Sequence, residues 1–522
     1  MPRASTRFAL VLATVLAGLV EGAKAYALEG ALDVNLRGLA REAPLEVTQA
    51  QLLAETSTLT DSREALQLHL FGFVRHRPIP ELGLRLGLDT GLLELRAVDG
   101  SAELLADGIE LGERFVETLF LGETYLDLQL GENGVVQTRW GKLRPRIGGG
   151  AIFDAYALGG MLDVDLQLTN PKLPLSFRAH LFYPDARFED SGKLSPFADL
   201  ELALRWGARN ELRLLLAGLW DGDQGATPVL VDAFARGGED RFAAARESLP
   251  SSVFVDAALD RVQRQLRELR GSGVLYALET EGWLGWTGVS LRLHEGPLTL
   301  EGVLLLGFGR LHLVSRATDE LRALVEGSAA LAGRADELLG LFDDEGDVDL
   351  LSAFGQLRAR VELLEDLDLR AFFLGMSGDD GLYPDESGSY GAFISLAPYL
   401  PHTSFFFGGA LAPAASVTVA SPAPDGAGLI AGGTFFEARV GRGFRFESGI
   451  AAMASVEPAP LTGGSFHGIE GNLLADAVLL DGISLHVDLA AFVPGDYYAT
   501  RAIAVQALLG ASARWGPRAF EF

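Results

Sequence analysis

The sequence predicts an all-β fold, a transmembrane antiparallel β-barrel of about 18 strands, with roughly 16 to 20 compatible with the pattern. Mean hydropathy is high, at +0.21, yet no stretch after the first residues has the length and composition of a membrane-spanning helix. Apolar and polar residues alternate strictly in many separate stretches, and short connections alternate with long ones. Because only helices and closed barrels satisfy the backbone in lipid, we favour a barrel over a large secreted soluble β-protein.

The first 27 residues have the features of a signal peptide. A basic start with Arg3 and Arg7 precedes the apolar run "FALVLATVLAGLV", and small residues at A-x-A spacing follow in "AKAYA". We therefore expect export through a Sec-type route, cleavage near Ala25 or Ala27, and a single barrel domain over residues 28–522. The chain contains no cysteine, which excludes a lipoprotein anchor, disulfides and thiolate chemistry.

Alternation with a period of two predicts the strands and their faces. It is clearest in "ELGLRLGLD" (81–89), "MLDVDLQLT" (161–169), "QLRARVEL" (356–363) and "ISLHVDLA" (483–490). One face of each is mostly Leu, Val and Ala, and the other is charged, as a barrel with an apolar outside and a polar inside requires. This pattern predicts that Val164, Leu166, Val361 and Val487 face lipid.

The connections give the strand order. Tight links such as "GENG" (131–134), "GARN" (207–210) and "LDG" (480–482) alternate with longer segments, as in barrels with short periplasmic turns and long external loops. The alternation is consistent along the chain if residues 272–294 form one long strand and "ALDVNLRGL" (31–39) forms the first. The alternating connections predict about 20 strands, with 18 equally compatible.

Two long connections have helical periodicity, residues 253–270 and 318–341. We expect both on the external side. Lids, constrictions folded into the barrel and partner surfaces are one interpretation, and surface elaborations without a gating role are the other.

The C-terminus ends on an apolar strand. Ile503, Val505 and Trp515 share a face there, and Trp515 is expected at the periplasmic membrane interface. The aromatic end, with Phe520 and Phe522, resembles the C-terminal signal by which the barrel assembly machinery recognises outer-membrane barrels. Arg518 and Gly516 depart from the alternation of that signal.

The stretch "VVQTRWGKLRPRIGGGAIFDAYALGGML" (135–162) resembles the alginate-export-type outer-membrane β-barrels, in which a strand runs into a basic segment and a Gly/Asp-bearing loop. "ALDVNLRGLARE" and "AAFVPGDYYATR" are similar to that family's first strand and late loop. The resemblance implies a barrel of about 18 strands whose lumenal basic residues conduct an acidic polysaccharide. The candidate pore-lining residues are Arg139, Lys142, Arg144, Arg146, Arg178, Arg358, Arg360 and Arg370.

The same polar faces also carry carboxylates, so the sequence leaves open whether these arginines conduct a solute or pair with acids across strands. The acids are Asp163, Asp165, Asp199, Glu201, Glu362, Asp368, Glu437 and Glu447.

The sequence shows no motif of an enzyme, cofactor site or metal site: there is no G-x-S-x-G, H-E-x-x-H or Walker loop. Removing the signal segment takes away three positive charges and one negative, which moves the formal charge from −27 to −29 and argues against a nucleic-acid partner. We expect a non-enzymatic protein of the bacterial outer membrane, in contact with lipid. It acts either as a channel for polar solutes, of polysaccharide-export or porin-like type, or as a non-conducting barrel that anchors an envelope complex for motility, adhesion or assembly.

Overall fold

The computed structural model describes residues 28–42, 63–79, 81–90, 93–98, 101–106, 109–110, 122–131, 134–170, 172–183, 195–207, 209–221, 257, 276–317, 319–329, 331–340, 344–379, 389–396, 400, 402–407, 426–441, 443–459, 462–498 and 502–515. The expected signal peptide, residues 1–27, and the aromatic end with Phe520 and Phe522 lie outside these residues, as does the segment 253–270 apart from residue 257.

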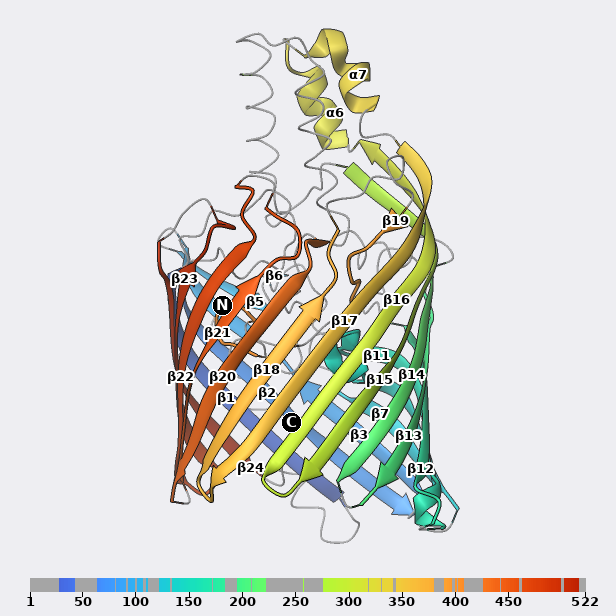
Figure 1. Ribbon diagram of the computed structural model, residues 1–522, viewed down its shortest axis with the longest axis vertical. Helices are drawn as coiled ribbons and strands as arrows, with labels where there is room; N and C mark the ends of the chain where they lie inside the picture. Colours follow the sequence, from blue (N-terminus) through green and yellow to red (C-terminus); the bar gives the residue numbers. More distant parts are fainter. Residues whose placement is uncertain are drawn as a thin grey trace.

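A closed antiparallel barrel of 18 strands forms the body of the protein (Figure 1). Its strands are β1 (Leu28–Glu42), β2 (Arg63–Ile79), β3 (Leu82–Asp89), β7 (Thr124–Leu130), β8 (Val136–Leu143), β11 (Ala157–Asp165), β12 (Leu175–Tyr183), β13 (Phe197–Trp206), β14 (Asn210–Asp221), β15 (Tyr276–Glu295), β16 (Leu298–Ala317), β17 (Asp344–Leu364), β18 (Leu367–Met376), β20 (Leu429–Val440), β21 (Phe444–Ala454), β22 (Phe466–Leu480), β23 (Ile483–Pro494) and β24 (Ala504–Trp515).

The remaining strands are short. On the rim, β4 (Leu93–Val98) pairs with β2, and β5 (Ser101–Ala106) and β6 (Ile109–Glu110) follow it. The pair β9 (Arg146–Ile147) and β10 (Phe153–Asp154) forms a separate small sheet, and β19 (Ser389–Tyr390) pairs in parallel with β17.

The first and last strands close the barrel. β1 runs antiparallel to β24 from the pair Leu32 and Trp515 to the pair Glu42 and Val505. The predicted first strand, 31–39, lies within β1, and residues 276–295 form the single long strand β15, as the connection pattern required. The predicted all-β barrel is confirmed. It has 18 strands, the lower of the two counts that the connections allowed.

All of the short connections lie at one end of the barrel, where β15 and β16 are joined across residues 296–297 and β22 and β23 across 481–482. The long connections lie at the other end (Figure 1). There the hairpin of β16 and β17 projects past the rim and carries α6 (Asp319–Glu326) and α7 (Ala335–Gly340). Helix is therefore confirmed within 318–341, on the side of the long connections.

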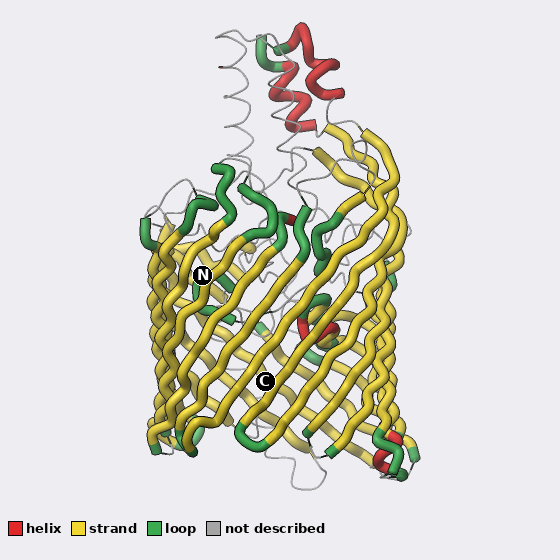
Figure 2. Tube along the Cα trace, viewed as in Figure 1, coloured by secondary structure: helices red, strands yellow, loops and turns green. Residues whose placement is uncertain are grey.

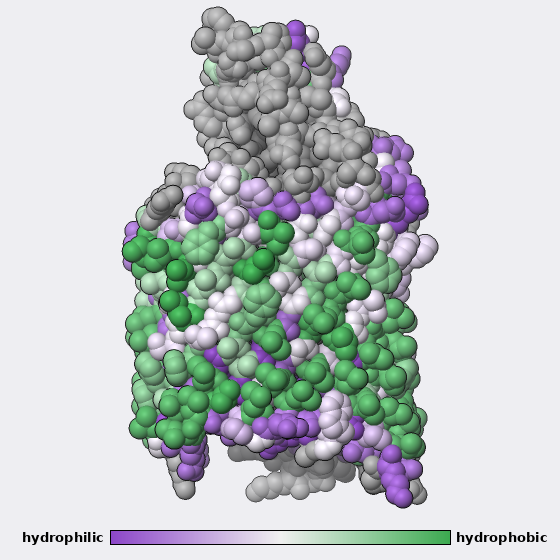
Figure 3. Space-filling view, in the orientation of Figure 1, coloured by the Kyte–Doolittle hydropathy of each residue, from purple (hydrophilic) through white to green (hydrophobic). Residues whose placement is uncertain are grey.

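The outer face is apolar, and the period-two pattern accounts for it. Along β16, Leu304 and Leu306 point outward and are 62% and 53% exposed, whereas Leu305 between them is 2% exposed and points inward. Figure 3 shows apolar residues as a band across the visible face of the barrel, bounded by hydrophilic residues at both ends. Trp206 and Trp515 are exposed at the short-turn end, where an aromatic girdle is expected.

One predicted strand ends early. Residues Leu166–Leu168 form a 3-10 helix after β11 and do not continue the strand, so Leu166 lies in a turn at the end of the barrel wall. The cause is Asp165, whose carboxylate accepts a hydrogen bond from the Gln167 amide at 3.0 Å. Such local side-chain bonds favour a turn over continued pairing.

We predict that Leu304→Arg destabilises the barrel by about 2–4 kcal/mol, because the side chain points into lipid near the middle of the apolar band. Ser484→Arg, on the inward face of β23, is the control and should cost far less. Urea unfolding of the barrel in lipid vesicles measures both. Equal destabilisation by the two variants would contradict the assignment of the faces.

The barrel lumen as candidate functional site

Ion pairs line the half of the lumen near the short turns, some within one strand and others between strands that are neighbours or next but one in the sheet. They include Arg75–Asp127 (2.9 Å), Arg178–Asp163 (2.7 Å), Arg205–Asp165 (2.7 Å), Arg213–Glu201 (2.7 Å), Arg360–Asp368 (2.6 Å), Arg439–Glu437 (2.8 Å), Arg445–Glu447 (2.9 Å) and Arg514–Asp33 (2.6 Å). Arg370 also pairs with Glu447. Arginine and carboxylate thus largely neutralise each other in this belt.

The other half of the lumen contains two inserted segments. The first insert, residues 144–156, includes β9 and β10 and buries Ile147, Ile152 and Phe153 against inward side chains of the wall. Figure 2 shows its short helical turn inside the barrel. That turn is Gly148–Gly150, whose three residues all have positive φ, a conformation that glycine adopts without strain.

The second insert is the described part of 391–407. It meets the first insert through the Leu396 amide, which donates to the Ile152 carbonyl at 2.9 Å. The Trp286 indole N–H of β15 donates to the Ile394 carbonyl at 3.1 Å. The aromatic run Phe405–Phe407 is almost fully buried. The two inserts therefore form one apolar body against the wall.

A buried carboxylate attaches the second insert to β22. Glu470 is fully buried, and its oxygens accept hydrogen bonds from the Phe405 and Phe406 amides at 2.7 and 2.9 Å and from the Thr403 hydroxyl at 2.6 Å. Asn472 accepts from the Ser404 amide at 2.9 Å. The wall thus supplies the polar partners that this non-helical, non-sheet backbone needs.

The structure places the candidate basic residues in several different environments. Arg139 lies 3.7 Å from Asp127 and beside the Tyr125 ring, and the Lys142 ammonium lies 5.0 Å from the centre of the Tyr156 ring. The Tyr156 hydroxyl donates to buried Asp89 at 2.6 Å. Arg139 thus contacts side chains of the wall and Lys142 contacts the end of the first insert, and the two do not form a single row with Arg144 and Arg146.

Arg144 and Arg146 share Asp154 of the first insert, at 2.9 and 3.5 Å. Their exposure differs: the Arg144 side chain is 11% exposed and that of Arg146 is 48% exposed. Arg144 therefore holds the insert together, whereas Arg146 presents its guanidinium to the lumen. Arg178, Arg360 and Arg370 belong to the belt of ion pairs.

Positive charge exceeds negative charge where the first insert meets β15–β17. Arg292 and Arg358 share one carboxylate, Glu301, at 2.9 and 3.4 Å. Arg146 lies near enough to act electrostatically on Arg358, and the glycine turn beside it packs on Val303 and Leu305 of β16. We call Arg146, Arg292, Arg358 and Glu301 the arginine group. Sequence reasoning missed Arg292, although the alternation of "SLRLHE" (290–295) places it on a polar face.

His402 of the second insert lies beside the arginine group and is neutral at pH 7. Its ring stacks on Phe372 at 4.2 Å and is edge-on to Phe407. Burial, and to a lesser extent the nearby Arg358 guanidinium, lower the pKa of His402 to about 3. It therefore adds no positive charge to the site.

Among the described residues, no group of three or more His, Asp or Glu side chains has the arrangement of a metal site. No helix in the described part of the chain is long and apolar enough to span a membrane.

No protein-family model and no curated protein matches this chain. Solved structures do. Pseudomonas aeruginosa OccK5 (OpdH) matches with a TM-score of 0.47 at 12% identity, over 94% of this chain and 98% of that one. Pseudomonas aeruginosa OccK9 (OpdG) gives 0.47 and 12%, over 94% and 99%, and OpdQ gives 0.46 and 10%, over 94% and 97%. Similarity at this level carries no argument about function.

We predict that Glu470→Ala loosens the second insert, because two buried amides lose their acceptor and each unsatisfied group costs about 1–3 kcal/mol. Hydrogen exchange at residues 402–407 should become faster. Asp165→Asn, which changes a carboxylate in the belt, is the control and should leave exchange at 402–407 unchanged. Unaltered protection in Glu470→Ala would mean that aromatic packing alone holds the insert.

Proposed function

We propose that the protein is an outer-membrane channel for small polar solutes, with a preference for anions. The arginine group carries this proposal. In the belt of ion pairs most arginines have a carboxylate partner each, whereas here two carboxylates serve four arginines: Arg292 and Arg358 share Glu301, and Arg146 shares Asp154 with Arg144. A low-dielectric wall strengthens the field of such unmatched charge and raises the local concentration of anions.

The apolar band, the aromatic residues at its edge and the closed backbone support insertion in a membrane. Cleavage of residues 1–27 after Sec-type export, and recognition of Trp515, Phe520 and Phe522 by the assembly machinery, belong to the same proposal. The driving force would be the solute gradient, and the channel would perform no chemistry.

Export of an acidic polysaccharide, which the alginate-export resemblance implies, is a narrower version of this proposal. The arginine group fits a carboxylate. The two inserts occupy part of the lumen, which favours a small solute over a polymer chain. Solute-flux assays with uronate monomers and oligomers in liposomes distinguish these cargoes.

A non-conducting anchor of an envelope complex is the alternative. The observations that favour it are the mutual neutralisation of the belt, the apolar body formed by the inserts, and the projecting hairpin of β16 and β17 with its helical tip (Figure 1). Planar-bilayer recordings separate the two functions, since a channel gives steady open-pore current and an anchor gives none.

We predict that Arg146→Ser and Arg358→Ser each shift the reversal potential in a salt gradient towards cation selectivity, because each removes positive charge from the arginine group. Arg310→Ser is the matched control. Arg310 lies on the outward face of β16, 59% exposed and paired with Asp347 at 2.8 Å, so its loss should leave selectivity unchanged. Equal shifts in all three variants, or none, would contradict an ion path past the arginine group.

A further inference from the structure

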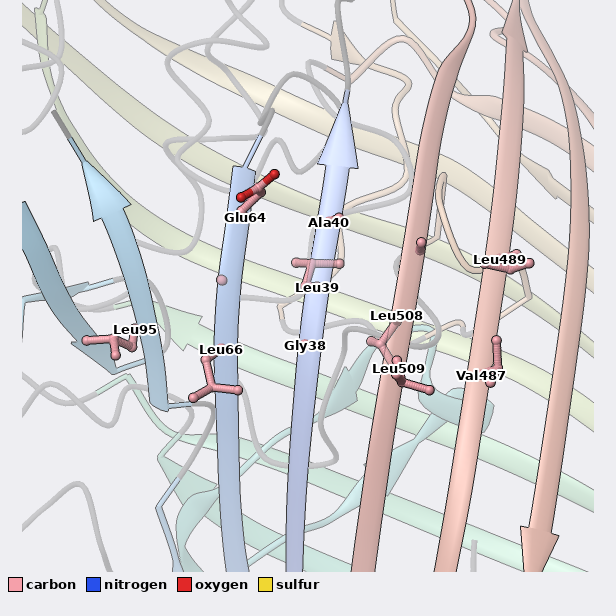
Figure 4. Close-up of a pocket in the computed structure, with 12 residues that line it drawn as sticks. Gly38, Leu39, Ala40, Glu64, Leu66, Leu95, Val487, Leu489, Leu508 and Leu509 are labelled. Carbon is pink, nitrogen blue, oxygen red and sulfur yellow. The ribbon is translucent and has the colours of Figure 1, made fainter. Parts of the chain in front are cut away.

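A groove lies on the lipid-facing side of the barrel, over the junction between its first and last strands. Its volume is about 760 Å³. Figure 4 shows it with Gly38 and Ala40 of β1 between two ridges, Leu66 and Leu95 on one side and Leu489 and Leu509 on the other. Of its twelve lining residues, Glu64 is the one charged residue.

The groove exists because small residues coincide at the junction. Ala40 of β1 pairs with Ala507 of β24, and the next outward residue of β1 is Gly38, opposite Leu509. On the other side of β1, Gly38 lies opposite Leu66 of β2. β1 thus places nothing larger than a methyl group on its outer face over these two positions. Since cross-strand side-chain pairs stabilise a sheet, the junction is short of apolar contact here.

We propose that this groove binds one acyl chain of a lipid in the external leaflet, and that the bound chain strengthens the junction of β1 and β24. The groove is continuous with the apolar band that already faces hydrocarbon. It lies in the halves of β1, β2 and β24 nearest the long connections. Glu64 at its edge fixes the direction of the chain, with the polar headgroup towards Glu64 and the hydrocarbon towards Val487.

The size of the groove favours a lipid over a protein. Twelve residues line it, whereas a stable protein interface involves about 20–30 residues on each side. A hydrocarbon chain needs no polar partner, and apart from Glu64 no lining side chain offers one. The proposal goes beyond the channel function and does not depend on whether the barrel conducts.

The test compares the full chain with Ala40→Leu/Ala507→Leu, in which protein side chains fill the groove. Native mass spectrometry counts lipid retained after purification in detergent, and the thermal midpoint of the heat-modifiable gel shift is measured with and without added dipalmitoylphosphatidylethanolamine. The wild type should retain lipid and gain thermal stability from added lipid. The double variant should lose the retained lipid, and its midpoint should no longer respond.

Ala452→Leu, an exposed position on the outer face of β21, is the matched control and should behave as the wild type. If the double variant does not fold, Ala507→Leu alone should show partial loss of retained lipid. Gly38→Ala offers a milder filling, because a Cβ there would lie 3.9 Å from the nearest atom, the Leu509 carbonyl oxygen. Retention equal to the wild type in the folded groove variants, or equal loss in Ala452→Leu, would overturn the proposal.

Discussion

The closure of β1 on β24 is the constraint on which the rest of the structure depends. In hydrocarbon an unpaired backbone amide or carbonyl costs several kcal/mol, so a sheet that spans a membrane must have no open edge. Eleven consecutive residue pairs join the two strands, from Leu32 and Trp515 to Glu42 and Val505. Closure then leaves each strand with one face to lipid and one to the lumen, and the strict alternation of the sequence follows.

The two halves of the lumen are filled by side chains of different kinds. Near the short turns many inward residues are charged, and carboxylates there are paired with arginines: Asp127, 1% exposed, accepts from Arg75 at 2.9 Å, Arg77 at 3.2 Å and Gln137 at 2.7 Å. Near the long connections the inward residues are apolar and pack on the inserts. Because buried charge is costly unless it is paired, the electrostatic character of the lumen depends on the few places where the pairing is incomplete. The arginine group is such a place.

The strands of the barrel wall could be predicted from the sequence because each of them repeats the same alternation of apolar and polar residues. Leu304, Leu305 and Leu306 show its limit: three consecutive leucines carry no alternation, and their faces are known only from the neighbouring residues of β16. The second insert could not be foreseen. The buried run Phe405–Phe407 has no period, and its fixing partner Glu470 lies 65 residues further on from Phe405. Charge pairing was expected from interleaved signs, but the sharing of Glu301 by Arg292 and Arg358 depends on strand register, which the sequence leaves open.

The two inserts are joined to the barrel wall and to each other. The Arg144–Asp154 ion pair fixes the first insert internally, and its glycine turn packs against β16, whereas Glu470 of β22 holds the second insert. The Leu396 amide and the Ile152 carbonyl join them, inside a common apolar cluster. If either insert left its place alone, it would expose a buried backbone group and apolar surface on the other. Separate movement of one insert is therefore unfavourable, and the position of Arg146 in the arginine group depends on the packing that both inserts share.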